Sequence, residues 1–248
     1  SVHRTSRGLR LPIAGEAAAT VDDRRAVSRV ALLADDTVGL RPTFKVAAGD
    51  TVRRGQLLFE DKTTPDVRYT APADGVVEDI HRGDKRAFQS LVLRLSDAER
   101  AGRGEQVAFP AFTGRDPAAL PADAVRELLL ESGLWTALRA RPFSRVARPA
   151  DTPRAIFVTA TDSDPLAPEP ADIIAPRRED FVRGLAALAA LTDGPLFVCT
   201  SADWSLPLPA LARLRHATFA GPHPSGTVGF HIHTLDPAGR NRLVWHAG

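Results

Sequence analysis

The amino-acid sequence predicts two units of different fold class, a small all-β unit followed by an open α/β unit. Short apolar runs separated by Gly, Asp and Pro fill residues 29–97, which is the pattern of many closely spaced strands. From residue 123 to 248, apolar runs of strand length alternate with helical periodicity, which is typical of a sheet covered by helices. Residues 98–122, rich in Gly, Pro, Ala and charge, form a connector, and residues 1–28 form a polar N-terminal arm.

The composition is that of an ordinary globular protein, and it excludes several functions. The chain has 248 residues, of which 44% are hydrophobic and 25% charged. Its net charge of +2 gives no bulk electrostatic reason to bind nucleic acid, so no nucleic-acid partner is expected. The longest apolar run, 185–191, is far shorter than the ~20 residues that cross a bilayer, so any membrane role is expected to come through partners. Cys199 is the only cysteine, which excludes an intrachain disulfide and a cysteine-ligated iron–sulfur cluster.

The all-β unit is built from short apolar runs, each bounded by turn residues. Turn signals such as Gly49-Asp50 and Thr64-Pro65-Asp66 separate the runs. The expected strands are 30–33, 44–46, 56–59, 67–70, 75–80 and 91–95. A further short strand is expected in the arm, near residues 9–13.

Part of the all-β unit resembles the biotinyl and lipoyl domains, whose fold is a barrel-sandwich hybrid. The resemblance lies in residues 46–60 and 71–77, where glycine turns alternate with apolar residues that fill a thin core. In such a domain Lys62 would be the lysine that carries a swinging acyl group. The loop at 63–66 is longer than a tight carrier hairpin, and the second half lacks a matching glycine turn. We therefore favour the fold without the modification.

The α/β unit is expected to begin with a helix that starts near Asp123, as an N-cap, and stops at Gly133. Val125, Leu128 and Leu129 repeat at helical spacing between these two residues. The elements expected after it are short helices at 134–139 and 210–214, a longer helix at 179–191, and strands at 155–159, 196–200, 228–234 and 243–246. The alternation of strands and helices predicts a Rossmann-like open sheet.

The loop after the strand at 155–159 argues against a nucleotide site. It contains Asp162 and Asp164, and neither a G-x-G-x-x-G sequence nor a P-loop is present. Two carboxylates there would repel a pyrophosphate, so no intrinsic NAD or ATP site is expected. Capping of the loop's own backbone is the simpler role for these two side chains.

Histidines gather late in the chain, at His216, His223, His231, His233 and His246. On the predicted strand 228–234, two of them are spaced i, i+2 and would share one face. This pattern is compatible with a metal or proton-relay site, or with a strand face that is polar or packs against a missing domain. No Cys, Asp or Glu lies at ligand spacing, so no metal site is expected. The turn-rich loop at 221–226 beside that strand face would clamp a ligand through backbone N–H groups, or only turn the chain.

Arg139, Arg141 and Phe143 place two cations and an aromatic ring close together after a predicted helix. Arginine donors and a phenyl face can hold a planar ligand with polar edges, such as a quinone head group. The alternative is that these arginines form ordinary surface pairs with carboxylates.

Eight collinear segments resemble the A subunit of the Na⁺-translocating NADH:quinone reductases. They occur in family order across nearly the whole chain, and together they are far more specific than any one alone. The segments are 8–15, 38–43, 58–62, 85–90, 131–136, 141–144, 155–159 and 221–224. Members of this family continue well beyond residue 248, so the C-terminal part of the family chain is expected to be absent.

The resemblance implies that the chain is peripheral and lies on the cytoplasmic face of the bacterial inner membrane. The family's complex couples NADH oxidation and ubiquinone reduction to Na⁺ export, with flavins and iron held by partner subunits. The family is related in fold to the flavin-binding subunit of complex I but has lost the flavin site, so no bound cofactor and no catalytic residue are expected in this chain. The family has been linked to quinone binding, and the residues expected to contact quinone are Val38, Gly39, Leu40, Arg41, Arg139, Arg141 and Phe143. A carrier module acylated at Lys62 and a soluble flavoprotein are the alternative functions.

Overall fold

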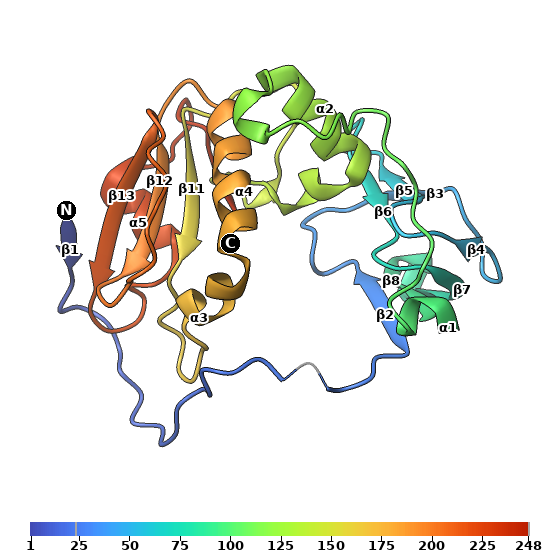
Figure 1. The fold of residues 1–248 in the computed structure, drawn as a ribbon, viewed down its shortest axis with the longest axis horizontal. Coiled ribbons are helices and arrows are strands. Elements are labelled where there is room, and N and C mark those ends of the chain that lie inside the picture. The colour runs from blue at the N-terminus through green and yellow to red at the C-terminus, as the bar shows by residue number, and fades with distance from the viewer. Residues whose placement is uncertain (23, 248) are drawn as a thin grey trace.

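The computed structural model describes residues 1–22 and 24–247, whose strands form three sheets (Figure 1). Two small sheets make up the all-β unit at one end of the molecule. A seven-stranded sheet with helices against it makes up the α/β unit at the other end. Helix α2 (Ala122–Ser132) lies between the two units (Figure 1). The predicted fold classes therefore both occur, in the predicted order.

The all-β unit consists of two antiparallel sheets. One has the strand order β2-β8-β7-β4 and the other the order β3-β5-β6. The strands are β2 (Arg29–Leu33), β3 (Pro42–Phe44), β4 (Thr51–Val52), β5 (Leu57–Asp61), β6 (Arg68–Thr70), β7 (Gly75–Arg82) and β8 (Phe88–Leu95). Each of the strands predicted for this unit overlaps one of these elements, whereas β4 has only two residues and was not predicted.

An aromatic cluster joins the two small sheets. Phe59 is fully buried and stacks on Tyr69 with ring centroids 4.6 Å apart. Phe44 and Phe88 meet Phe59 edge to face at 5.4 Å and 5.5 Å. Phe88 belongs to the four-stranded sheet and the other three rings to the three-stranded sheet. Aromatic pairs contribute about 0.5–1.5 kcal/mol each beyond their buried area, so this cluster stabilises the contact between the sheets.

The large sheet has the strand order β1-β13-β12-β11-β14-β9-β10. The first five strands of this order are parallel, and β9 and β10 are antiparallel additions at one edge. The strands are β1 (Val2–Arg4), β9 (Arg139–Arg141), β10 (Arg145–Val146), β11 (Ala155–Ala160), β12 (Leu196–Ser201), β13 (Leu214–Ala220) and β14 (Val244–Ala247). Strand β12 lies on one side of β11 and β14 on the other. The direction in which successive strands are added to the sheet therefore reverses at β11, as in doubly wound folds.

Alternating side chains of β11 determine which helix packs on which face of the sheet. Ile156 and Val158 belong to a core cluster that also contains Leu185 of α4. Phe157, which points to the other face, belongs to a second cluster with Ile232 of α5. The strand is buried on both faces, which explains its continuous apolar sequence.

The remaining helical elements are α4, which has 13 residues, and several shorter ones. Besides α2, the chain forms α1 (Asp97–Arg100), α3 (Pro170–Ile174), α4 (Arg178–Ala190) and α5 (Val228–Leu235), with 3₁₀ turns at Asp84–Arg86, Pro117–Ala119, Leu134–Ala137 and Ala175–Arg177. The helix predicted at 179–191 therefore corresponds to α4. No helix of the described residues has the length and apolar character needed to cross a bilayer.

The prediction of a strand at 228–234 was wrong, because these residues form helix α5. Val228, Phe230 and Ile232 alternate as in a strand. Val228, Ile232 and Leu235 also repeat at i, i+4 and i+7, and this helical spacing is the one that packs against the sheet. A short apolar run of this kind fits both periods.

Two further expectations along the large sheet were wrong. Residues 210–214 form no helix; the chain turns there and enters β13 at Leu214. Polar residues interrupt β13, and only Ala217 and Phe219 are buried, so its strand pattern is weak. In the arm, the strand lies at Val2–Arg4 and pairs with β13, while the segment predicted near 9–13 makes a single bridge from Leu9.

The region after α2 follows the predicted stop but not the predicted continuation. Gly133 ends α2 in the left-handed conformation, with φ of 81°, as expected. The helix begins at Ala122 after Pro121, so Asp123 lies inside its first turn and is not the N-cap. The helix predicted at 134–139 is a 3₁₀ turn at Leu134–Ala137 followed by strand β9.

Candidate functional site

Residues 139–141 form strand β9, next to the edge strand β10 of the large sheet, rather than the end of a helix. Strand β9 pairs antiparallel with β14, and Arg139 lies directly across from His246. Arg141 lies two residues further along β9, across from Val244. Residues two apart on a strand, and residues directly opposite on neighbouring strands, share one face. Arg139, Arg141 and His246 are therefore neighbours on the same face of this edge.

A cavity of about 340 Å³ lies where this edge meets the all-β unit. The all-β unit contributes Val38 and Asp61 to its wall, and the α/β unit contributes Arg141 and Phe143. The Phe143 side chain is 75% exposed, so its ring remains available to a ligand. The two segments that the sequence analysis singled out for quinone contacts thus meet at one cavity, although a long stretch of sequence separates them.

Asp61 organises the wall that belongs to the all-β unit. Its carboxylate accepts hydrogen bonds from the Arg41 backbone N–H at 3.0 Å, and from the Thr63 backbone N–H and hydroxyl at 3.0 Å and 2.7 Å. Asp61 is only 4% exposed. The carboxylate therefore fixes the turn after β5 against the segment 38–41. Lys62, at the start of this turn, is exposed and held by a backbone N–H bond to the Arg41 carbonyl at 2.9 Å.

The arginines of β9 are not surface partners of carboxylates, which was the alternative considered from the sequence. Arg139 donates through Nη2 to the Asp36 carbonyl, which ties β9 to the all-β unit. Its Nη1 and the Nε of Arg141 are buried and have no hydrogen-bond partner among the described residues. Within residues 1–22 and 24–247, neither Arg139 nor Arg141 forms an ion pair with a carboxylate.

His246 is the residue of this edge that sequence reasoning did not assign to it. Its side chain is 7% exposed, and its Nε2 has no partner among the described residues. Burial, followed by the positive charges of Arg141 and Arg139, lowers the pKa of His246 to about 4. The imidazole is therefore neutral near pH 7. The strand at 243–246 was predicted, but its pairing with β9 carries no signal in the sequence.

The predicted quinone residues do not all reach the cavity. Val38, Arg141 and Phe143 line it, and Arg139 lies beside Arg141 on the same strand face. Gly39, Leu40 and Arg41 do not line it. Gly39 is exposed with φ of 77°, Leu40 packs against the core, and Arg41 contributes only backbone bonds.

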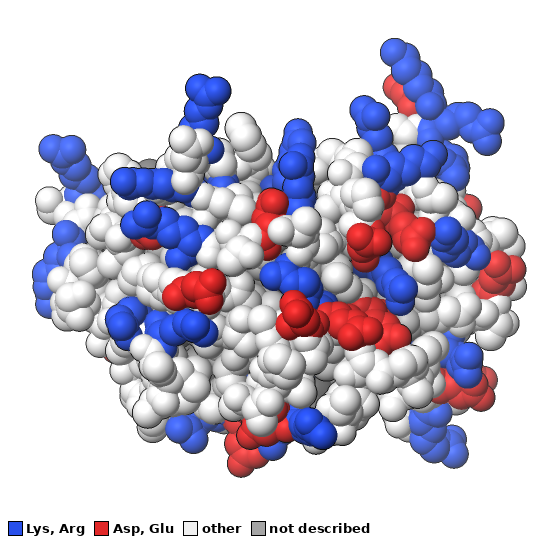
Figure 2. Space-filling view, turned by 90° about the horizontal axis from the view of Figure 1, so that it is seen from above, with Lys and Arg blue, Asp and Glu red and all other residues white. Residues whose placement is uncertain are grey.

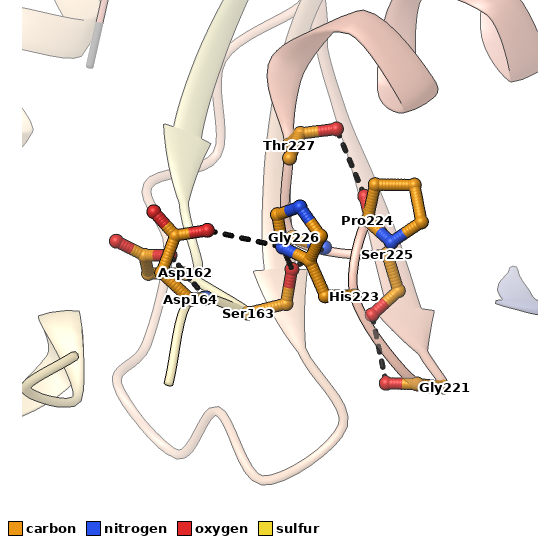
Figure 3. A network of polar contacts seen from close by, with 9 residues as sticks. All are labelled: Asp162, Ser163, Asp164, Gly221, His223, Pro224, Ser225, Gly226 and Thr227. Atoms are coloured by element: carbon orange, nitrogen blue, oxygen red, sulfur yellow. Dashed lines mark hydrogen bonds and ion pairs between the residues drawn. The ribbon is translucent and has the colours of Figure 1, made fainter. Parts of the chain in front are cut away.

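A second polar cluster links the loops that follow β11 and β13 (Figure 3). His223 Nδ1 lies 3.1 Å from Ser163 Oγ and 3.0 Å from Asp164 Oδ1. A Ser-His-Asp triad needs the serine and the carboxylate on different ring nitrogens, whereas here both contact the same one. The arrangement therefore joins two loops and does not activate Ser163. The Gly226 N–H, which donates to Ser163 Oγ at 2.9 Å, strengthens the same link.

Of the two aspartates of the first loop, Asp162 has the capping role considered from the sequence, whereas the Asp164 carboxylate contacts His223 instead. Asp162 accepts a hydrogen bond from the Asp164 backbone N–H at 2.8 Å, which caps the loop. Beside the loop, at the carboxyl ends of β11, β12 and β13, lies a cavity of about 350 Å³. Its wall includes Asp162 and Asp203, carboxylates that disfavour a phosphate ligand.

The expectation that His231 and His233 share a strand face was wrong, because both lie on helix α5. Residues two apart on a helix point in nearly opposite directions. His231 is fully buried, with Nε2 2.9 Å from the Ser225 carbonyl, whereas His233 is exposed. Burial lowers the pKa of His231 to about 4. Within the described residues, no group of three or more His, Cys, Asp or Glu side chains is placed to hold a metal ion.

The outer surface carries mixed charge. Figure 2 shows acidic side chains gathered toward the middle of the face seen from above, and basic side chains spread around it. A groove of about 350 Å³ is lined by Glu60 and Asp66 of the all-β unit and by Asp123, Glu127 and Glu131 of α2, together with Arg68 and Arg126. The acidic groove and the arginine-lined cavity are therefore different parts of the junction.

The fold is a barrel-sandwich hybrid followed by a doubly wound α/β domain without a glycine-rich nucleotide loop, and comparison with known proteins agrees. The family described as "NqrA N-terminal barrel-sandwich hybrid domain" matches residues 3–96, and the family described as "NqrA second alpha/beta domain" matches residues 120–248. The chain belongs to the NqrA family, the A subunits of the Na⁺-translocating NADH-quinone reductases.

Curated relatives are named as the A subunit of a Na(+)-translocating NADH-quinone reductase. The protein of Serratia proteamaculans is 48% identical over 242 residues, which is 98% of this chain and 53% of the relative. Those of Alcanivorax borkumensis and Pasteurella multocida are each 44% identical, over 98% and 97% of this chain and 53% and 52% of the relatives. The chain thus spans about half the length of the curated relatives it matches.

Proposed function

We propose that this chain acts as a peripheral subunit of a Na⁺-translocating NADH:ubiquinone oxidoreductase and contributes contacts to the quinone at the junction of its two units. Family membership supports the first part. The second part rests on one observation, the convergence of Val38, Arg141 and Phe143 on a single cavity. The guanidinium of Arg141 can donate to a quinone oxygen, and the exposed Phe143 ring can pack on the planar head group.

The same proposal assigns the redox chemistry to partner subunits. Flavins and iron would be held there, and this chain would position and shield the quinone without a cofactor of its own. We place it at the cytoplasmic face of the bacterial inner membrane, attached through those partners. We also propose that residues 29–97 and 123–248 form its two domains, the second related to the flavin-binding subunit of complex I. The strand order around β11 supports that relationship, and the nucleotide loop is replaced by the Asp162 loop.

Purification from the native membrane tests the assignment to a complex. The tagged chain, in its full natural length, would be isolated in mild detergent, and its partners identified by mass spectrometry. We expect multi-span and flavin-bearing subunits, with Na⁺-stimulated quinone reduction by NADH in the eluate. Recovery of the protein alone, or of a form acylated at Lys62, would refute the proposal and favour the carrier function.

Substitution of Phe143 tests the quinone contact itself. In the whole complex, Phe143→Ala is expected to raise KM for quinone by about three- to tenfold with little change in kcat, because it removes a packing contact of roughly 0.5–1.5 kcal/mol. Phe112→Ala is the matched control, since Phe112 is also exposed, at 65%, and does not line the junction cavity. Equal kinetics of the two variants would exclude Phe143 from the site.

A further inference from the structure

Strands β9 and β14 carry four buried nitrogen atoms that lack partners among the described residues. One is Nε1 of Trp245, and the other three lie on the opposite face of the sheet. These three are Nη1 of Arg139, Nε of Arg141 and Nε2 of His246. The register of the two strands places all three side chains on one face. A buried polar group without a partner is costly, and native proteins usually satisfy such groups with water, an ion or a ligand. Three such atoms on neighbouring side chains of one strand face indicate one common site.

No ion pair of the described residues involves Arg139 or Arg141, although Asp61 and Asp151 line the cavity that Arg141 also lines. Asp61 is the nearby buried carboxylate, but its oxygens accept hydrogen bonds from Arg41 and Thr63, and it forms no ion pair in the described structure. Asp36 offers Arg139 only its backbone carbonyl. Two partly buried guanidinium groups therefore lie beside one buried imidazole on the same strand face, and an anion next to them would be stabilised.

We propose that Arg139, Arg141 and His246 form a binding site for an oxyanion, either a carboxylate or a phosphate group. Arginine presents planar N–H donors that match the oxygens of both groups, and a neutral imidazole protonated at Nε2 supplies one more donor. The depressed pKa of His246 agrees with this placement, because it reflects burial beside two positive charges. The site extends the proposed function by giving the junction a preference for negatively charged oxygen.

The oxyanion site shares Arg139 and Arg141 with the proposed quinone contact, and its ligand binding can be tested without quinone or partner subunits. The purified chain would be titrated with inorganic phosphate and, separately, with acetate at constant ionic strength. Calorimetry would give the affinity, and NMR would follow the imidazole resonances of His246. Tighter binding of phosphate would indicate a phosphate-bearing ligand, and tighter binding of acetate a carboxylate.

Arg141→Gln removes one charged donor and is expected to weaken binding by roughly tenfold or more. Arg141→Lys keeps the charge without the planar donor set and should restore only part of the affinity. Arg100→Gln is the control, since Arg100 forms an exposed i, i+3 pair with Asp97 on α1. We expect saturable binding that shifts the imidazole resonances of His246. The affinity should fall in Arg141→Gln and stay unchanged in Arg100→Gln. No saturation with either anion, or equal weakening in both glutamine variants, would overturn the site while leaving the quinone assay unaffected.

Discussion

Trp135 and Trp245 meet edge to face with ring centroids 5.4 Å apart, and both side chains are fully buried. Trp135 belongs to the turn after α2, and Trp245 to strand β14 inside the large sheet. The Trp135 indole N–H also donates to the Ala147 carbonyl at 2.7 Å. This contact joins the segment beside the all-β unit to the sheet that carries Arg139, Arg141 and His246.

Removal of the Trp135 ring should therefore be among the most destabilising changes in the chain. Trp135→Ala is expected to lower the free energy of unfolding by about 3–5 kcal/mol through the cavity it leaves. Trp135→Phe keeps much of the ring contact and loses the bond to Ala147, so a smaller loss of about 1–3 kcal/mol is expected. Urea denaturation followed by circular dichroism measures both. Similar losses in the two variants would show that ring packing against Trp245 contributes little.

Acid should destabilise the fold through two buried histidines. The pKa of both His231 and His246 falls from 6.5 to about 4 on folding. Below pH 6.5 the unfolded chain binds protons that the folded chain does not, so stability decreases as pH falls from 6.5 toward 4. Between pH 7 and pH 5, each histidine is expected to remove about 2 kcal/mol from the free energy of unfolding.

Urea denaturation at the two pH values, for the wild type and for His231→Gln and His246→Gln, checks this contribution. Each variant should start less stable at neutral pH and lose less on acidification than the wild type. A wild-type stability that stays constant between the two pH values would contradict the prediction.

How much the sequence predicts depends on how local the deciding interactions are. Strand β11 and helix α4 were predicted because their burial is continuous or strongly periodic. Helix α5 and strand β13 were missed, because a short apolar run fits both periods and an interrupted strand depends on its neighbours. The candidate site was likewise predictable only where local sequence decides it. Side-chain chemistry drew attention to Arg141 and Phe143, whereas the pairing of Arg139 with His246 is a long-range register that only the assembled sheet reveals.

Asp61→Asn should loosen the wall of the junction cavity. An amide oxygen at the Oδ1 position still accepts from the Arg41 and Thr63 backbone N–H groups, but without the negative charge, and the NH₂ group at the Oδ2 position cannot accept the hydrogen bond of the Thr63 hydroxyl. We expect a loss of about 1–3 kcal/mol. Hydrogen exchange should speed up at residues 37–41 and 62–64 and stay unchanged in β12. Unchanged exchange at 37–41 would mean that the segment is held by other contacts.

Two glycines should respond in opposite ways to alanine. A Cβ at Gly75 would lie 2.2 Å from the Arg94 carbonyl oxygen in the β7–β8 pair, so Gly75→Ala must push two central strands of the all-β unit apart. A Cβ at Gly184 meets nothing within 4 Å, and Gly184 lies inside α4. Gly184→Ala should therefore raise the free energy of unfolding by about 0.5–1 kcal/mol through helix propensity and reduced entropy of the unfolded chain. Gly75→Ala should lower it by at least about 1–3 kcal/mol, the range for overpacking. Thermal unfolding of the two variants beside the wild type measures both signs, and a destabilised Gly184→Ala would contradict the prediction for α4.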